Sequence, residues 1–236
     1  MTLDAATKKK IAAEAAVNEY VKDGMNVGLG TGSTAYYAIK RIGELVRGGY
    51  KLKCVATSLE SERLAKAEGI EIVDLNTVDK LDVTIDGADE VDPEMQLIKG
   101  LGGALLREKI VAAATVKEII IADASKRVEK LGTRAPLPVE VLKFGAQKTK
   151  YALERQGCIA DLRVWEGAPY ETDSGNYIYD CRFKGGIDNP FFLESRIDVI
   201  PGVVENGLFL NTAFDVIFCE DDGTVTKMSD KLTKKQ

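Results

Sequence analysis

The sequence contains no histidine among its 236 residues. This absence excludes the Ser-His-Asp triad, Cys-His pairs, zinc sites built on histidine, and histidine as a general acid or base. If the chain is an enzyme, its proton transfers depend on carboxylates, lysine, tyrosine or cysteine.

Long apolar runs and basic tracts are also lacking. No apolar run approaches the ~18 residues that a membrane helix needs, and the charged, Ala-rich N-terminus is not typical of a signal peptide. Lysine and arginine are dispersed, and the net charge is −5. The sequence therefore predicts neither a membrane protein nor a nucleic-acid-binding protein.

Cysteine is sparse. The four cysteines are far apart and form no C-x-x-C motif; they are Cys54, Cys158, Cys181 and Cys219. We therefore expect reduced, mostly buried thiols in a cytoplasmic protein.

Strands and helices alternate along the first half of the sequence. Apolar spacing predicts helices over 4–21, 34–46, 59–69 and 104–116. The pair Thr57 and Glu60 has the spacing of a capping box for the third of these helices. Compact β-branched runs predict strands over 25–29, 50–58, 70–75, 81–86 and 118–125. This order indicates a Rossmann-like α/β fold with a mostly parallel sheet and helices on both faces.

The pattern changes near residue 132. Strands are predicted over 136–142, 158–166, 176–183 and 202–210, with helices over 145–157 and 189–198. This β-α-β-β-α-β order is ferredoxin-like and predicts a smaller α+β domain over 133–207. A hairpin over 214–228 is expected to return to the first sheet, so that 1–132 and 208–236 form the larger domain.

The stretch "GLGTGSTA" lies between a predicted strand and a predicted helix. Such a turn presents backbone N–H groups at the positive end of the helix dipole and is typical of phosphate binding. Gly30-x-Gly32-x-x-Ala35 matches a dinucleotide fingerprint, but no acid ends the next strand. No G-K-[ST] follows, so the ATP-binding P-loop is absent too. A plain turn capped by Ser33 or Thr34 is the alternative.

Acidic residues lie at the end of the strand over 81–86 and directly after it. They are Asp86, Asp89, Glu90 and Asp92. Open α/β sheets bind ligands at this end of their strands, and crowded carboxylates can share protons or hold Mg²⁺. A solvated acidic turn is the alternative.

Two lysines and a glutamate follow further strands. Lys99 precedes a second glycine-rich loop, Glu108 stands nine residues later in a predicted helix, and Lys126 ends "ADASK". Lys99 could stabilise an oxyanion, Glu108 could carry protons, and Lys126 could bind phosphate. An exposed helix-face acid and a surface lysine are the ordinary alternatives. All these clusters follow strands that a parallel sheet would align along one edge.

Together these residues resemble the ribose-5-phosphate isomerase A family. The resemblance rests on "GLGTGSTA", "DGADEVD", "MQLIKGLGGALLREK", "IADASK", "LGTRAPLPVEV" and "IPGVVENGLF", which are spread over residues 28–209 in the family's order. Each motif is modest alone, but the set is highly specific.

The resemblance implies particular roles. Glu108 would be the base, assisted by Asp86, Asp89 and Lys99, and Lys10 is a weaker candidate for phosphate binding. The implied substrate-binding residues are Thr31, Gly32, Ser33, Thr34, Asp86, Gly87, Ala88, Asp89, Lys99, Gly100, Leu101, Gly102 and Lys126. Many members have Gly-Gly after the lysine, whereas Leu101 follows Gly100 here.

The implied reaction interconverts ribose 5-phosphate and ribulose 5-phosphate, in the non-oxidative branch of the pentose phosphate pathway. It passes through a cis-enediol(ate) and needs no metal or redox cofactor. The implied partners are a sugar-phosphate substrate and further copies of the chain, as a homodimer or homotetramer. The alternatives are a CoA transferase-like enzyme or a sugar-phosphate-sensing module on the same fold.

Overall fold

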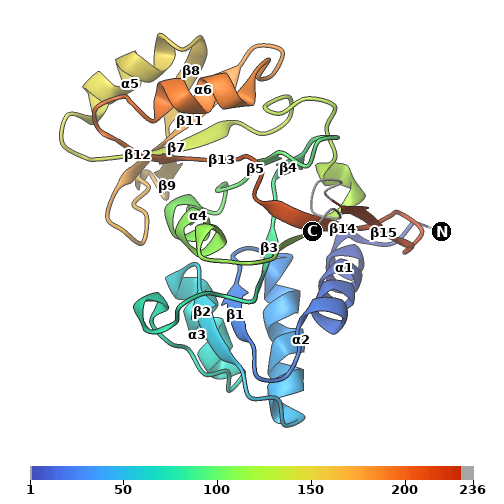
Figure 1. Ribbon diagram of the computed structural model, residues 1–236. Coiled ribbons are helices and arrows are strands. Elements are labelled where there is room, and N and C mark those ends of the chain that lie inside the picture. Colours follow the sequence, from blue (N-terminus) through green and yellow to red (C-terminus); the bar gives the residue numbers. More distant parts are fainter. Residues whose placement is uncertain (1, 230–236) are drawn as a thin grey trace. The chain divides into compact units, whose positions relative to one another are not determined.

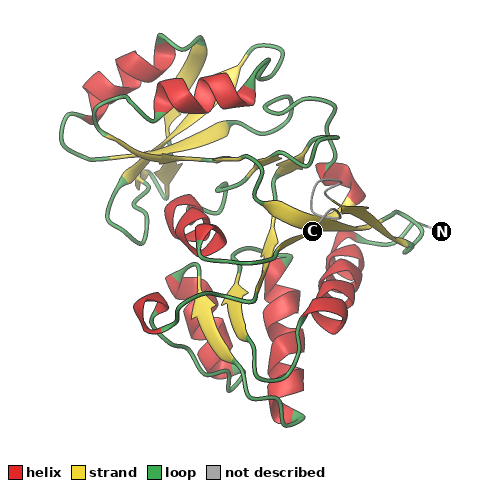
Figure 2. Ribbon diagram, viewed as in Figure 1, coloured by secondary structure: helices red, strands yellow, loops and turns green. Residues whose placement is uncertain are grey.

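The computed structural model describes residues 2–229, which divide into two compact units. The first unit runs to Ala88, then includes Arg107–Lys126 and resumes at Thr212; the second comprises Asp89–Leu106 and Arg127–Asn211. Figure 1 traces the chain, and Figure 2 marks its helices and strands. Each unit has its own sheet and its own apolar core.

The first unit contains a six-stranded sheet. Its strands are β1 (Asn26–Leu29), β2 (Lys53–Ala56), β3 (Val83–Gly87), β6 (Glu118–Asp123), β14 (Ala213–Cys219) and β15 (Val225–Ser229). They lie in the order β15-β14-β6-β3-β1-β2, and every neighbouring pair is parallel except β14 with β15. The mostly parallel sheet is thus confirmed, as is the return of the hairpin to it.

The order of the strands reverses between β1 and β3. From β1 the chain adds β2 on one side, then continues with β3, β6 and β14 on the other. Ligands of open α/β sheets bind at such a switch point, beyond the carboxyl ends of the strands. The glycine-rich loop follows β1 and the acidic loop follows β3, so both lie at this edge.

Helices pack on both faces of this sheet. On one face α1 (Ala5–Tyr20), α2 (Ala35–Arg47) and α3 (Leu59–Ala67) share a core with alternate strand residues such as Ile85 and Ile119. On the other face, Val111 of α4 (Leu105–Ala113) packs with Val55 of β2. Side chains alternate between faces along a strand, so the neighbouring Cys54 lies in the first core.

Two local predictions were wrong. Residues 70–75 form no strand: Ile72 makes a single bridge to Cys54, and the 3₁₀ turn η1 (Leu75–Thr77) follows at once. The helix α3 is capped by Ser58, whose hydroxyl oxygen accepts the N–H of Ser61 at 3.0 Å. Thr57 instead donates its hydroxyl to a strand carbonyl. One residue of register separates the two caps, and both are hydroxyl residues, so the sequence pattern did not distinguish them.

The second unit contains the predicted β-α-β-β-α-β order. Its elements are β7 (Leu137–Val141), α5 (Ala146–Glu154), β8 (Cys158–Leu162), β11 (Tyr177–Phe183), α6 (Pro190–Ile197) and β12 (Val203–Asn206), with the short pair β9 (Val164–Trp165) and β10 (Ala168–Pro169) between β8 and β11. The antiparallel sheet has the order β12-β7-β11-β8. In Figure 1, α5 and α6 lie together on one of its faces.

The boundaries of the units differ from the expected 133–207. Three short strands, β4 (Glu90–Val91), β5 (Leu97–Ile98) and β13 (Leu208–Phe209), pair with one another in the order β13-β5-β4. This pairing carries residues 89–106 and 208–211 into the second unit. The loop after Lys99 therefore belongs to the second unit, whereas the sequence pattern placed it in the larger domain.

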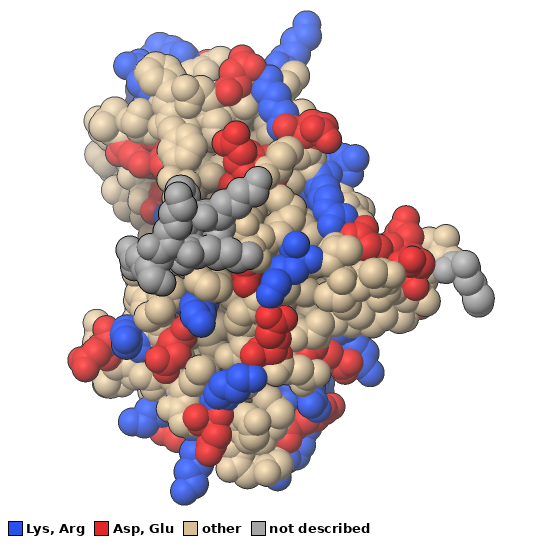
Figure 3. All heavy atoms as spheres, turned by 45° about the vertical axis from the view of Figure 1, so that its right-hand side comes forward, with Lys and Arg blue, Asp and Glu red and all other residues tan. Residues whose placement is uncertain are grey.

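Charge is dispersed over the visible surface. Figure 3 shows acidic and basic side chains interspersed on that face rather than gathered by sign. Within residues 2–229, no helix is long and apolar enough to cross a membrane.

Candidate active site

The glycine-rich loop begins with a close contact between Gly30 and Asp86. A Cβ atom at Gly30 would lie 2.2 Å from Asp86 Oδ1 and 2.5 Å from its Cα, so only glycine fits here. The buried Asp86 carboxylate accepts the N–H of Thr31 at 3.0 Å. The loop after β1 is thus held by the carboxylate of Asp86 in β3.

The hydroxyl of Thr31 lies among other hydroxyls. Its Oγ1 atom is 2.7 Å from that of Thr57, 2.8 Å from Ser58 Oγ and 3.2 Å from Ser61 Oγ. Ser61 in turn donates to the carbonyl of Gly30 at 2.7 Å. These bonds join the loop to the start of α3, so the Thr31 side chain supports the loop.

The backbone amides at the start of α2 differ from that of Thr31, because within residues 2–229 they are not hydrogen-bonded to the protein. Within the described residues, the N–H groups of Gly32, Ser33, Thr34 and Ala35 have no protein acceptor. Thr34 occupies the cap position of α2 but its side chain makes no capping bond, so the alternative of a hydroxyl-capped turn is wrong. Consecutive N–H groups at a helix N-terminus, beside the positive end of its dipole, form a ready site for an anion.

A lysine from α1 approaches this loop. Lys9 Nζ donates to Ser33 Oγ at 2.9 Å. Lys10, the candidate drawn from the resemblance, lies 3.7 Å from Glu14 and its side chain is 59% exposed. The lysine run at 8–10 is visible in the sequence, but only the rotation of the helix determines which member faces the loop.

Lys126 follows the neighbouring strand β6. It is half-buried at the end of the 3₁₀ turn η2 (Ala124–Lys126). Before it stands Asp123, whose carboxylate accepts the N–H of Ser125 at 3.0 Å. Burial raises the pKa of Asp123, but hydrogen bonds from Ser125 and the charge of Lys126 outweigh burial, and the pKa lies below its ordinary value. An ionised carboxylate thus lies beside Lys126.

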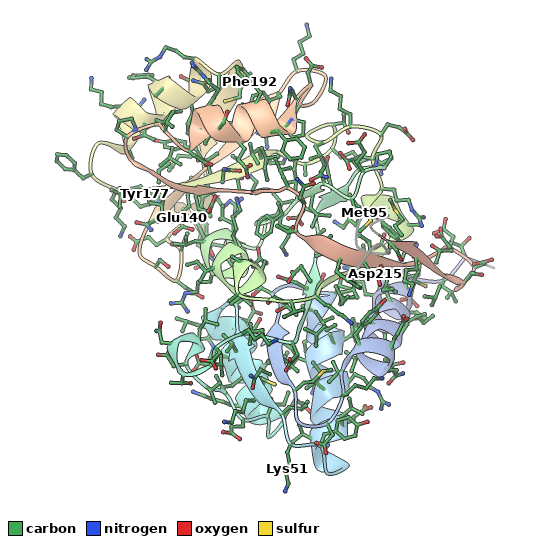
Figure 4. All side chains as sticks on the ribbon, viewed as in Figure 1. Lys51, Met95, Glu140, Tyr177, Phe192 and Asp215 are labelled. Carbon is green, nitrogen blue, oxygen red and sulfur yellow. The ribbon has the colours of Figure 1, made fainter. Side chains whose placement is uncertain are left out.

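The acidic residues between positions 86 and 92 have different roles. Asp86 belongs to the first unit and Asp89 to the second. The fully buried Glu90 accepts backbone N–H groups of the segment 132–135 at 2.5–2.7 Å. Asp92 accepts two amides of its own turn, which includes Met95 (φ 62°, labelled in Figure 4). Burial raises the pKa of Asp92.

Glu90 and Asp92 are therefore structural carboxylates rather than members of an acidic patch. Glu140, labelled on β7 in Figure 4, is another: it is buried and accepts from Thr172 at 2.8 Å and Asn176 at 2.9 Å. Among residues 2–229, no group of three or more carboxylates or cysteines has a metal-binding arrangement.

Lys99 directly follows β5 and is 2% exposed. Its N–H donates to the carbonyl of Gly207 at 3.0 Å, and its ammonium lies 5.2 Å from the ring centre of the buried Phe209. An aromatic face attracts a cation, and more strongly where water is excluded. Lys99 is thus a buried lysine at the start of the second glycine-rich loop.

Leu101 lies between two glycines of the second glycine-rich loop. Its φ is not positive, whereas Gly100 (φ +95°) and Gly103 (φ +85°) adopt the left-handed region. Its N–H donates to Asp89 Oδ2 at 3.0 Å and its side chain is partly exposed. The backbone conformation at 101 therefore does not require glycine, and both the N–H and the carbonyl of this residue are bonded within the second unit.

Glu108 lies in the first turn of α4 and is 5% exposed. The alternative of an exposed acid on a helix face is wrong. A carboxylate this well shielded from water, in a chain that lacks histidine, is suited to transfer protons without exchanging them with solvent.

Known proteins resemble this chain over most of its length. The family model for ribose 5-phosphate isomerase A (phosphoriboisomerase A) matches residues 53–223. The chain belongs to this family. A ribose-5-phosphate isomerase A of Gloeobacter violaceus is 55% identical over 216 residues, which cover 91% of this chain and 93% of that protein. The protein of the same name from Bacillus mycoides is 47% identical over 215 residues, covering 91% and 96%.

Solved structures of the family agree with the fold. Ribose 5-phosphate isomerase from Plasmodium falciparum has a TM-score of 0.93 and 39% identity, covering 96% of this chain and 99% of that one. A D-ribose-5-phosphate isomerase in complex with phospho-erythronic acid has a TM-score of 0.92 and 40% identity, covering 96% and 100%. The resemblance inferred from the motifs is thus confirmed across nearly the whole chain.

Proposed function

We propose that this isomerase interconverts D-ribose 5-phosphate and D-ribulose 5-phosphate through a cis-enediol(ate). The observation that carries the proposal is Glu108, a buried carboxylate in a family member that has no histidine. A single carboxylate on one face of the sugar can take the C2 proton and return it at C1, so no second base is needed.

The first unit is proposed to bind the phosphate. The open N–H groups of Gly32–Ala35 offer donors to its oxygens, and Lys9 adds a positive charge beside Ser33. Lys126 is proposed to add a further charge. The hydroxyl of Ser33 completes the donor set, while Thr31 maintains the shape of the loop.

The remaining residues are proposed to act on the sugar itself. Asp86, Gly87, Ala88 and Asp89 would line the sugar, and the loop Lys99–Gly102 would contact its reacting end. The substrate first opens to its aldehyde. Glu108 then removes the C2 proton, the electrons move to O1, and the ammonium of Lys99 stabilises the developing negative charge. The O2–H proton moves to O1, and Glu108 delivers its proton to C1.

We also propose that the protein forms a homo-oligomer and is cytoplasmic. Several large apolar side chains of the second unit are exposed, among them Phe144 at 95% and Phe192 at 64% (labelled in Figure 4). This exposure favours self-association as a homodimer or homotetramer, which sedimentation can measure. All four cysteines are free and buried, which fits a cytoplasmic enzyme.

The decisive test is an assay of the purified protein with ribose 5-phosphate, with and without EDTA. We expect ribulose 5-phosphate to form at the same rate in both. Absence of product would overturn the proposed activity. Activity that is lost to EDTA and restored by a divalent ion would overturn only the metal-free mechanism.

A further inference from the structure

The loop that follows Lys99 has its backbone carbonyls bound by one side chain. Arg163 Nη1 donates to the carbonyl of Gly100 at 3.1 Å and to that of Leu101 at 3.0 Å. The carbonyls of an irregular segment have no ladder partners, so bonds of this kind determine how its peptide planes are oriented. A single guanidinium nitrogen thus fixes two consecutive peptide planes of the loop.

The guanidinium of Arg163 also forms a two-point ion pair with Asp180. Its Nε donates to Asp180 Oδ2 at 3.0 Å and its Nη2 to Oδ1 at 2.5 Å. The two side chains are only 12% and 17% exposed, so salt screens this pair weakly. Asp180 lies on β11, which pairs with strands on both of its sides. The fork geometry and the central strand together give Arg163 a rigid mounting.

Tyr170 covers the other end of the same loop. A Cβ atom at Gly103 would lie 2.1 Å from the Tyr170 hydroxyl, so only glycine lets the ring approach this closely. The ring centre lies 5.8 Å from Cζ of Arg163, and the Tyr170 N–H donates to the Arg163 carbonyl at 2.9 Å. Arg163 and Tyr170 therefore form one assembly against the loop.

We propose that Arg163, mounted on Asp180, is a positioning residue for the isomerase reaction: it fixes the conformation of the loop Lys99–Gly102. This inference rests on the proposed function, in which that loop contacts the reacting end of the sugar. Lysine cannot replace the arginine, because one ammonium does not reach a bidentate carboxylate and two carbonyls at once.

The test compares Arg163→Lys and Arg163→Ala with the unsubstituted protein. A displaced loop places reacting groups badly, so we expect kcat to fall by about 10- to 100-fold with a smaller change in KM. Added methylguanidinium is expected to restore part of the kcat of Arg163→Ala. Unchanged kcat in both variants would overturn the proposal.

A matched control is available on β8, which ends just before Arg163, and on β11, which carries Asp180. Arg182 of β11 forms an ion pair with Asp161 of β8 at 2.9 Å, but both side chains are more than half exposed, and within residues 2–229 neither is hydrogen-bonded to the loop. Arg182→Ala is expected to retain full kcat. An equal loss in Arg182→Ala and Arg163→Ala would overturn the proposal, because it would trace the effect to the sheet.

Hydrogen exchange separates this proposal from the proposed function. If Arg163 fixes the loop, amides of residues 99–103 exchange faster in Arg163→Ala and in the milder Asp180→Asn, with circular dichroism unchanged. Unaltered exchange would overturn the positioning role even if kcat falls. Absence of isomerase activity in the unsubstituted protein would instead overturn the proposed function, before any variant is compared.

Discussion

The two glycine-rich loops are built in opposite ways. The loop after β1 leaves four consecutive N–H groups without protein acceptors, while Asp86 and a group of hydroxyls hold its first residues. In the loop after β5, carbonyls and an amide are already bonded to Arg163 and Asp89. The first loop is thus open to a ligand, whereas the second has its backbone fixed by the protein.

The difference matches what each loop is proposed to do. A phosphate carries several oxygens and can be bound by any set of converging donors, so open amides suffice. A reacting carbon tolerates far less displacement, so the group that acts on it needs a rigid backbone. Glycine serves both loops, but it provides access to a ligand in the first and close approach of Tyr170 in the second.

The largest effect is expected at Glu108, the proposed base, because both loops are proposed to hold the substrate against this residue. Glu108→Gln keeps the size of the side chain and removes the base, so we expect kcat to fall by about 10²–10⁴-fold with KM nearly unchanged. Glu44→Gln, at an exposed ion pair on α2, is the control and should retain full activity. Near-normal turnover of Glu108→Gln would show that Glu108 is not the base.

The contact between Gly30 and Asp86 leaves no room for a methyl group, so a substitution at Gly30 is expected to destabilise the protein. Gly30→Ala places a Cβ atom against the side chain and backbone of Asp86, so we expect a loss of about 1–3 kcal/mol in the free energy of unfolding. Gly32→Ala meets no neighbouring atom and is expected to cost less, about 1 kcal/mol of backbone strain. Urea unfolding measures both, and the reverse order would contradict the proposed packing.

Lys9, which lies beside the open amides of the first loop, is expected to affect KM rather than kcat. Lys9→Met removes a charge beside Ser33, and we expect about 1 kcal/mol weaker phosphate binding, or about a fivefold increase in KM. Lys51→Met, before β2 and labelled in Figure 4, is the control at the other end of the strands and should leave KM unchanged. A fall in kcat alone would argue against a phosphate contact.

The carboxylate beside Lys126 predicts a dependence on pH. Because the pKa of Asp123 is below its ordinary value of 3.8, its contribution to stability is complete above that pH and is lost as the pH falls through the lowered pKa. Asp123→Asn is therefore expected to lower the free energy of unfolding by about 1 kcal/mol at pH 7. The difference should shrink below pH 4, as urea unfolding at both pH values would show.

The smallest effect is expected at Leu101. The backbone of this residue has a conformation that any residue adopts, and its N–H and carbonyl are bonded to Asp89 and Arg163. Leu101→Gly is therefore expected to keep kcat within about twofold and to lower stability slightly, by about 0.5–1 kcal/mol of backbone entropy. A large loss of kcat would mean that the side chain itself contributes to turnover.

The fold and the family were predictable from sequence because both depend on local patterns. Buried β-branched runs indicated most strands, and ordered motifs indicated the isomerase family. The tertiary supports were not predictable. Arg163 and Asp180 are separated in sequence from the loop that they hold, and no spacing rule links Glu90 to the amides at 132–135. The same limit applies to Lys9, which only the rotation of α1 distinguishes from Lys10.

The position of β14 has a consequence for how the protein is made. This strand comes from residues 213–219, yet it lies inside the first sheet, between β6 and β15. Most of the chain must therefore be synthesised before the first sheet can be completed. Until then, β6 presents an unpaired edge to the cell, so the nascent chain is most exposed to aggregation in the interval before β14 emerges.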